Sequence, residues 1–467
     1  MVGLPHRFAD RSAVADVLAA HEDLEPGASS GTHYRLAGRV LGRRGMGKAA
    51  FLDLEDRSGR MQLMASADGL GPHYEQLTDV NLGDIVGVAG EAVRSRRGEL
   101  SLQLDSYELL APGERSLPDK HHGLADVETR YRQRYLDLLI NPEVRADFEL
   151  RARAITALRR ELDAAGFIEV ETPTLQPLYG GANARPFTTH HNELDRDLYL
   201  RIATELYLKR LIVGGLERVY EIGKNFRNEG VSFKHNPEFT LLEWYEAYAD
   251  VDDAMTRTES LVAAAAVAAN GTTRVARDGV EVDLAPPWPR VPLMRAIEER
   301  TGIDALAVRD PDELRRLAVA AGAQAAAGDK TWPQLVDRLL SHFVEPEITS
   351  PVFLVDYPVE LSPLARRRED DPSMVERFEA FVLGMEIANG FSELNDADDQ
   401  LSRFQEQVRN REAGDDDAQP LDEDYVEALR YGMPPTGGVG LGIDRLVMLL
   451  ANRHSIRDVI LFPALRT

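Results

Sequence analysis

PPTGGVGLGIDRLVMLLANRHSIRDVILFP, residues 434–463, is the most informative segment of the chain. Its four glycines within six residues, Gly437 to Gly442, lead into an apolar helix that carries Arg445 in its first turn. Glycine at this density indicates backbone that approaches a ligand closely or adopts angles closed to other residues. A cation at the start of a helix suits a phosphate. The alternative is a glycine-rich turn before a core helix, and G-V-G-L-G lacks the GxGxxG spacing of a dinucleotide site.

A second segment, RVYEIGKNFRNEGVSFKHNPEFTLLEWYEAYAD, extends from Arg218 to Asp250. Its pattern predicts a strand at Val219–Ile222 and a second strand at Phe239–Glu246, in which alternating residues share a face. A polar loop connects the two strands. The residues that we single out in this loop and on the second strand are Arg227, Glu229, His235, Asn236, Glu243 and Tyr245.

The composition is that of a soluble globular protein. With 467 residues the chain is long enough for two or three domains, and it is 43% hydrophobic and 28% charged. The longest apolar run, Leu261–Ala269, is about half the length that crosses a bilayer. The N-terminus has no apolar core for a signal peptide, and the absence of cysteine excludes disulfides and thiolate chemistry. We therefore expect a cytoplasmic protein without a membrane partner.

Charge is distributed unevenly along the chain. The net charge of −24 argues against a nucleic-acid partner, and acid is dense at residues 370–371 and 415–424. Five basic residues and no acidic ones lie between Arg35 and Lys48, however, and a second basic cluster lies at residues 94–97. Either cluster could be a solvated face, but a basic patch on an acidic body can still bind a polyanion.

The order of patterns predicts several domains. Residues 1–33 form an extension, residues 34–112 contain five short strands typical of a small closed barrel of the oligonucleotide-binding (OB) fold, and residues 113–126 form a linker. Residues 127–165 are helical up to Gly166, and residues 250–350 are predicted as a helical insertion outside the main sheet. The pattern near the end predicts a strand in PVFLVDYPV, a helix around Met374–Val382 and a strand in GMEIANGFSEL.

Six sequence motifs resemble a known family. The strand–loop–strand with FRNE, followed by GxGxGxDR, resembles motifs two and three of the class II aminoacyl-tRNA synthetases, and GFIEVETP (Gly166–Pro173) resembles motif one. TRYRQRYLDL at Thr129, LARR at Leu364 and GFSELND at Gly390 resemble the bacterial lysyl-tRNA synthetases. The resemblance covers nearly the whole chain. It implies an α+β multidomain protein with an N-terminal OB-fold barrel that binds the anticodon, a catalytic antiparallel sheet with flanking helices over residues 127–467, and a homodimer.

The resemblance implies a site for ATP. Arg227 would clamp the α-phosphate together with the amino-acid carboxylate, and Arg445 would bind the far phosphates, so these two arginines are the predicted catalytic residues. Phe239 would stack on adenine. Glu379 and Glu386 would hold Mg²⁺, although solvated surface charge is the alternative for both. The complete predicted ATP site is Arg227, Glu229, His235, Asn236, Phe239, Glu379, Glu386 and Arg445.

The resemblance also implies sites for lysine and for tRNA. Glu393 and Tyr245, supported by Glu243, would face the side-chain ammonium of lysine, because a buried carboxylate rejects apolar amino acids. Glu205 and the backbone of Gly181 would bind the α-ammonium. The remaining predicted contacts are Asn389 and Phe391 for the wall of the lysine pocket and Arg43, Phe51 and Gln62 for the anticodon, with barrel core as the alternative for Phe51.

Two positions depart from the family pattern. Met385 and Ala388 lie where arginine and glycine are expected, and an added methyl at Ala388 would trim the substrate pocket. The expected partners are tRNA(Lys), L-lysine and ATP. Alternative functions are lysylation of a protein such as elongation factor P, supply of lysyl-tRNA for lipid modification, and non-catalytic binding. The anticodon barrel and Gly440 favour the tRNA ligase over the relatives that lysylate a protein.

Overall fold

The computed structural model describes residues 4–45, 47–115, 117–118, 124, 126–412 and 419–465. The chain divides into two compact units, Met1–Gly123 and Leu124–Thr467. Much of the predicted linker and the acidic residues 415–417 lie outside the described residues. Within the described part, no helix combines the length and the apolar character needed to cross a membrane.

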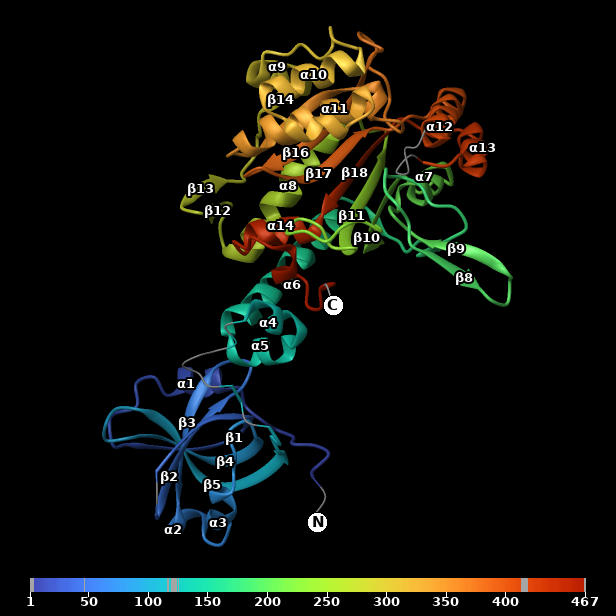
Figure 1. Ribbon diagram of the computed structural model, residues 1–467. Helices are drawn as coiled ribbons and strands as arrows, with labels where there is room; N and C mark the ends of the chain where they lie inside the picture. The colour runs from blue at the N-terminus through green and yellow to red at the C-terminus, as the bar shows by residue number, and fades with distance from the viewer. Residues whose placement is uncertain are drawn as a thin grey trace. The chain divides into compact units, whose positions relative to one another are not determined.

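The first unit is a closed five-stranded barrel (Figure 1) with the strand order β1-β2-β3-β5-β4. Its elements are α1 (Val14–Ala20), β1 (Ser29–Arg44), β2 (Ala49–Glu55), β3 (Arg60–Ser66), α2 (Ala67–Leu70), α3 (His73–Thr78), β4 (Ile85–Arg94) and β5 (Leu100–Ala111). Alternate residues of β2 and β3, such as Leu52, Leu54 and Leu63, fill the barrel interior. Val14 and Val17 of α1 belong to the same core, so the predicted N-terminal extension contributes to the barrel.

The second unit is built on an eight-stranded sheet with the order β14-β15-β16-β17-β18-β11-β10-β6. Its strands are β6 (Ile168–Glu169), β10 (Arg218–Phe226), β11 (Glu238–Ala247), β14 (Arg290–Pro292), β15 (Val352–Pro358), β16 (Met374–Val382), β17 (Met385–Ser392) and β18 (Thr436–Gly442). All neighbours are antiparallel except the two outermost pairs. The fold class predicted from the sequence is confirmed.

Helices and two small sheets surround this sheet. The helices are α4 (Val127–Arg132), α5 (Arg134–Ile140), α6 (Pro142–Ala164), α7 (Glu205–Val213), α8 (Val251–Asn270), α9 (Leu293–Thr301), α10 (Pro311–Ala321), α11 (Trp332–Leu339), α12 (Ala397–Glu412), α13 (Glu423–Arg430), α14 (Ile443–Leu450) and α15 (Ile456–Val459). The small sheets contain β7 (Leu175–Gln176), β8 (Thr188–His191), β9 (Arg196–Leu200), β12 (Arg274–Arg277) and β13 (Val280–Asp283).

The helix predicted around Met374–Val382 is wrong, because this segment is strand β16. It pairs with β15 on one side and with β17 on the other. The glutamates and alanine of VERFEAFV favour a helix locally, but Phe378 and Phe381 pack into apolar clusters and the strand is central in the sheet. Packing on a half-buried pleated surface therefore overrides local preference.

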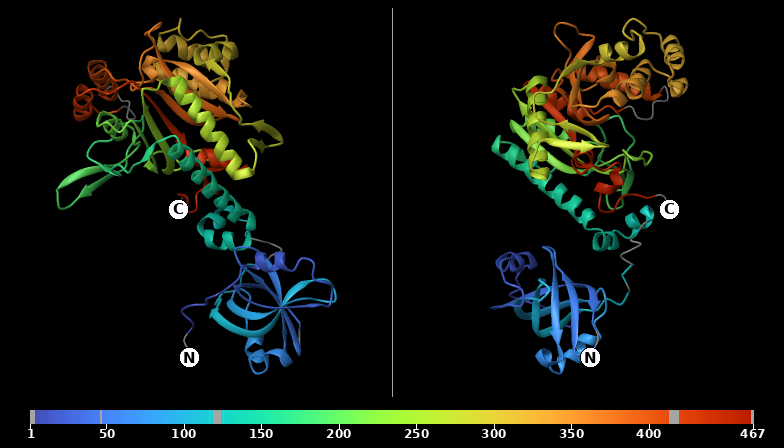
Figure 2. Two further views of the ribbon diagram at one scale, coloured as in Figure 1. Left: turned by 180° about the vertical axis from the view of Figure 1, so that it is seen from behind. Right: turned by 90° about the vertical axis from the view of Figure 1, so that its left-hand side faces the viewer.

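The predicted insertion, residues 250–350, also differs from expectation. Helix α8 packs against α6 and against the central strands β17 and β18, across the face seen from behind in the left view of Figure 2. Leu261, Val262 and Ala265 on α8 are buried in the same cluster as Trp244 and Val439 of the sheet. Strand β14 lies in the sheet itself. Only α9, α10 and α11 form a separate cluster, which packs on β15 and β16.

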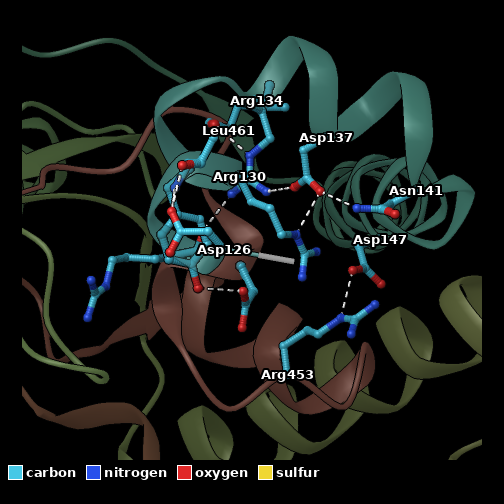
Figure 3. Close-up of polar contacts among 12 residues, drawn as sticks. Asp126, Arg130, Arg134, Asp137, Asn141, Asp147, Arg453 and Leu461 are labelled. Atoms are coloured by element: carbon cyan, nitrogen blue, oxygen red, sulfur yellow. Dashed lines mark hydrogen bonds and ion pairs between the residues drawn. The ribbon is translucent and has the colours of Figure 1, made fainter. Parts of the chain in front are cut away.

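A buried charge network at α5 holds the segment after α14 (Figure 3). The Arg134 guanidinium donates to Asp137 Oδ2 at 2.6 Å and to the main-chain oxygens of Arg457 and Leu461 at 2.8 and 3.0 Å. Asp137 also accepts from Arg130 Nε at 2.8 Å. Arg134 is 1% exposed and Asp137 is fully buried, so every charge in this network depends on its partner.

Replacing Asp137 by alanine is expected to lower the free energy of unfolding of the second unit by about 3 kcal/mol, because Arg134 is left as a buried, uncompensated charge. A urea titration followed by tryptophan fluorescence measures this unit alone, since the three tryptophans, Trp244, Trp288 and Trp332, all lie in it. The exposed Asp312, paired with Arg315 at 2.5 Å, provides the control, and D312A should change stability by less than about 0.5 kcal/mol. Equal effects of the two substitutions would contradict this account.

Candidate active site

One cavity of about 470 Å³ in the second unit is lined by every residue that the sequence predicted for ATP and lysine binding. The predicted residues come from β11, β16, β17, α7, α14 and the connecting loops. Along β11, Leu242 and Trp244 point into the core under α6 and α8, whereas Glu243 and Tyr245 line the cavity. The cavity therefore opens on the sheet face opposite those two helices.

Arg227 lies directly after β10, at the start of the loop that joins β10 to β11. Its backbone N–H donates to Pro237 O at 2.9 Å, which closes the loop, and its guanidinium carbon lies 5.1 Å from the ring centre of Phe239. Burial lowers the pKa of Arg227, and its Nε has no hydrogen-bond partner among the described residues. A partly desolvated guanidinium with an unused donor is suited to an anionic ligand.

Arg445 in the first turn of α14 points toward the same cavity. Its Nη1 donates to Glu386 Oε2 at 2.8 Å and to Glu386 O at 2.9 Å, and its Nη2 lies 3.4 Å from His235 Nε2. Burial and the nearby charges of Arg445 and Lys234 lower the pKa of His235. A neutral imidazole adds no further positive charge beside Arg227 and Arg445.

Glu379 and Glu386 lie on the neighbouring strands β16 and β17. Arg377 Nη2 donates to Glu379 Oε1 at 2.6 Å, and Arg377 Nε donates to Asn389 Oδ1 at 3.0 Å. Burial raises the pKa of Glu379 to about 7, Arg377 opposes this change and Glu386 adds to it. Among the described residues, no cluster of three or more acidic, histidine or cysteine side chains could hold a metal by itself. Two carboxylates nevertheless suit Mg²⁺, which typically takes one or two carboxylates and completes its shell with water and phosphates.

Carboxylates concentrate at the other end of the cavity. Glu243 Oε1 accepts from Thr204 N at 2.9 Å, and Tyr245 OH donates to Glu243 Oε2 at 3.3 Å. Burial raises the pKa of Glu243 to about 7. Glu393 is 1% exposed, and its oxygens accept no hydrogen bond of normal geometry within the described part of the chain. Buried carboxylates of this kind suit a positively charged ligand that pairs with them.

The glycine-rich segment is a strand rather than a turn. β18 lies between β17 and β11, and its glycines form part of the cavity wall. A Cβ atom at Gly438 would overlap Glu393 Oε1 and the ring of Tyr245. Glycine at position 438 therefore allows two predicted lysine-binding residues to lie against the strand, and a close approach of this backbone to a ligand stays a prediction.

Sequence analysis missed several residues of the cavity. Gln419 Oε1 accepts from Gly181 N at 3.0 Å, and Gln419 Nε2 donates to Asn183 at 3.3 Å. The glutamine lies in an acidic stretch whose pattern gives no signal. Arg377 has a signal, because it alternates with Glu379 in VERFEAFV and so shares its face. The incorrect prediction of a helix at Met374–Val382 obscured this alternation.

The interpretation of Ala388 as a residue beside the substrate is wrong. Met385 and Ala388 are 3% and 2% exposed, respectively, and both belong to the apolar core on the far side of the sheet. Neither is among the residues that line the cavity. Side chains on a strand alternate between faces, so Asn389 and Phe391 face the cavity while Ala388 faces away from it. The methyl group at Ala388 does not trim the pocket.

The barrel brings only some of the predicted anticodon residues together. Phe51 alternates with the core residues Leu52 and Leu54, is half-buried and lies outside the barrel core, contrary to the alternative interpretation. Gln62 shares this outer face, since it pairs with Asp53. Arg43 pairs with the inward-facing Leu52 and donates to Val80 O at 3.1 Å, so it does not join them. Its neighbour Arg44 pairs with Phe51 instead.

A largely antiparallel sheet with two arginines and a row of carboxylates facing one cavity is the arrangement of a class II tRNA synthetase. The profile of the family described as tRNA synthetases class II (D, K and N) matches residues 126–466, and that of an OB-fold nucleic acid binding domain matches residues 34–110. These matches confirm the predicted class.

Comparison with sequence relatives identifies a family within this class. The lysine–tRNA ligase of Pelotomaculum thermopropionicum is 54% identical over 433 residues, which cover 92% of this chain and 86% of the relative. That of Moorella thermoacetica is 53% identical over 437 residues (93% and 89%), and that of Chloroflexus aurantiacus is 51% identical over 465 residues (99% and 94%). The chain belongs to the lysine–tRNA ligase family of the class II tRNA synthetases.

Proposed function

We propose that this protein activates L-lysine with ATP and transfers the lysyl group to tRNA(Lys). The observation that carries the proposal is one cavity with arginines at one end and buried carboxylates at the other. The arginine end suits phosphates and the carboxylate of an amino acid, and the acidic end suits ammonium groups. Lysine has both kinds of group, and the sequence relatives are lysine–tRNA ligases.

The first step requires positioning and neutralisation of charge rather than a strong base. The lysine carboxylate is ionised at neutral pH, attacks the α-phosphorus of ATP and displaces pyrophosphate, which leaves lysyl-adenylate. Arg227 is proposed to hold both the carboxylate and the α-phosphate, since a guanidinium binds two oxygens at once. Arg445 is proposed to bind the far phosphates. Phe239, with Glu229, His235 and Asn236, is proposed to hold the adenosine.

The second step transfers the lysyl group. A hydroxyl at the 3′ end of tRNA attacks the carbonyl carbon of the adenylate, and AMP leaves with the bonding electron pair. Throughout both steps Glu393, Tyr245 and Glu243 are proposed to hold the side-chain ammonium, and Glu205 with the Gly181 backbone to hold the α-ammonium. Asn389 and Phe391 form the wall between these groups.

We propose Mg²⁺ as the metal cofactor, held by Glu379 and Glu386. Both carboxylates line the cavity on adjacent strands, and an oxygen-rich pair is a fitting site for a hard cation. When bound, the ion would neutralise phosphate charge. The chain's own contribution is to orient these carboxylates: Arg377 fixes Glu379, and Arg445 fixes Glu386.

We further propose a cytoplasmic homodimer. The sequence resemblance supports the dimer, and so does β6, which ends the sheet and has an exposed Ile168. Sedimentation equilibrium of the purified protein tests the dimer, and a mass of about one chain would overturn it.

The anticodon proposal predicts that Phe51→Ala leaves lysine-dependent ATP–pyrophosphate exchange unchanged and lowers kcat/KM for tRNA charging by about tenfold or more, since stacking of one base contributes roughly 1–3 kcal/mol. The half-buried outer-face position of Phe51 supports this separation. Phe51→Trp, which retains a stacking surface, is the matched control and should charge tRNA nearly normally. Equal loss of both activities in F51A would overturn the assignment of the barrel.

Lysine-dependent ATP–pyrophosphate exchange followed by charging of total tRNA tests the function itself. Exchange with transfer to tRNA supports the ligase. ATP–pyrophosphate exchange without transfer to tRNA would favour the alternative function, in which the lysyl group is transferred to a protein such as elongation factor P. Absence of exchange with every amino acid would leave only a binding role.

A further inference from the structure

A lysine residue of the protein lies behind the proposed lysine pocket. Lys209 on α7 is fully buried, and its Nζ lies 2.5 Å from Glu205 Oε1 and forms an ion pair with Glu393. The same ammonium lies 5.3 Å from the ring centre of Phe391. Glu205, Glu393 and Phe391 line the cavity, whereas Lys209 is not among its lining residues. Lys209 therefore contacts two proposed substrate-binding carboxylates from the side away from the substrate.

The charges of the pocket show how the contacts of Lys209 bear on substrate binding. Glu205, Glu243 and Glu393 supply three carboxylates, and Lys209 supplies one ammonium group that the substrate does not contact. When all three carboxylates are ionised, two negative charges remain, which equals the number of ammonium groups on free lysine. Arg377 also faces Glu205 but is paired with Glu379. The tyrosines that face this group, Tyr245 from β11 and Tyr425 from α13, add no charge at neutral pH.

We propose that Lys209 is a positioning residue for lysine recognition, which holds Glu205 and Glu393 in place and balances part of their negative charge so that both can bind the substrate's ammonium groups. This inference rests on the proposed function and adds to it a residue that does not contact the substrate.

Electrostatics support the geometry. Burial raises the pKa of Glu393 well above its ordinary value and also raises that of Glu205, and Lys209 is the main influence that opposes both changes. Burial lowers the pKa of Lys209, but Glu205 and Glu393 raise it above its ordinary value, so the lysine stays charged. Without this ammonium, three buried acids would share a proton, because like charges in a desolvated site disfavour joint ionisation.

Lysine-dependent ATP–pyrophosphate exchange by Lys209→Met, measured from pH 6 to 8.5, tests the proposal. We expect KM for lysine at pH 7 to rise at least about thirtyfold while KM for ATP stays within about threefold. The raised carboxylate pKa values leave the acids protonated at low pH, so the loss should be largest at pH 6 and should shrink as pH rises. Lys330→Met, at an exposed lysine, is the matched control and should match the parent at every pH.

Calorimetry provides a readout that a purely structural role would not change. Lysine binding is titrated in two buffers of different ionisation enthalpy, which counts the protons released. The Met variant should release about one more proton per lysine than the parent, because a carboxyl group must ionise to bind the ammonium. Lys209→Gln, which retains hydrogen-bond donors but not the charge, should behave in the same way.

An unchanged lysine KM, or a raised KM without a changed pH profile and without extra proton release, would overturn the proposal. Failure of both variants to fold would assign Lys209 to stability and overturn it equally. If the unaltered protein shows no lysine-dependent exchange, the proposed function itself fails. This result is distinguishable from the outcomes above, which concern the Lys209 variants alone.

Discussion

Arg227→Ala is expected to reduce lysine-dependent ATP–pyrophosphate exchange at least about a thousandfold, which is the scale of effect for an arginine that stabilises charge in phosphoryl transfer. Burial around the guanidinium and its unused Nε are the structural reasons, because water does not replace the lost donor efficiently. The loss should appear mainly in kcat, since both reacting groups are bound by this one side chain. A single-turnover measurement of adenylate formation separates it from any later step.

Two controls sharpen this prediction. Arg227→Lys keeps the charge but not the planar fork, so most of the loss should remain. Arg274→Ala removes an arginine whose side chain is 63% exposed on the β12–β13 hairpin, and its exchange rate should equal that of the parent. An Arg227→Ala protein with more than about a tenth of the parent rate would contradict the phosphate-clamp role.

The second large effect is expected at Glu393. Glu393→Gln keeps the shape of the side chain and removes its charge, so the KM for lysine should rise about a hundredfold or more, in line with roughly 3–5 kcal/mol for breaking a buried ion pair. Glu393 is 1% exposed and forms its ion pair with Lys209, so both the substrate and the protein's own lysine lose a partner. Initial rates of exchange as a function of lysine and of ATP measure the effect.

The decisive observation is that the KM for lysine rises while the KM for ATP changes little. KM for ATP should stay within about threefold, because the arginines and Phe239 are untouched. Glu299→Gln, at an exposed glutamate of α9 paired with Arg295, should change neither constant. A parallel rise in both constants would indicate general distortion of the cavity and would contradict a direct contact between Glu393 and lysine.

The sequence predicted the barrel and the central sheet well, because strand alternation and short motifs are local signals. The wrong helix prediction and the wrongly assigned side-chain faces share one cause, because both depend on which strands pair in the folded protein. The segment at Met374–Val382 has helical composition but lies between two strands. For Ala388 and Arg43, the side of the sheet on which the side chain lies was predicted wrongly, because that side depends on the strand register. A shift of one residue reverses the face of every side chain on a strand, and register is set by partners far away in sequence.

The site residues that were missed have a related explanation. Arg377, Gln419 and Lys209 act through contacts with other site residues rather than through a motif of their own. Lys209 lies four residues after Glu205 on α7, which is an ordinary helical ion-pair spacing. Nothing in that spacing shows that the pair is buried behind a cavity or that Glu393, distant in sequence, completes it. Only the folded arrangement reveals the shared lysine.

The network around Arg134 has a consequence for biosynthesis. The main-chain oxygens that satisfy this arginine belong to residues 323 to 327 positions further along the chain. A ribosome that has just made α5 has not yet made Arg457 and Leu461, so Arg134 lacks these main-chain partners until they have been synthesised. Closing so long a loop is slow and entropically unfavourable. The catalytic unit is therefore expected to become resistant to proteolysis only after the residues up to Leu461 have left the ribosome, whereas the barrel, complete by residue 111, can fold while synthesis continues.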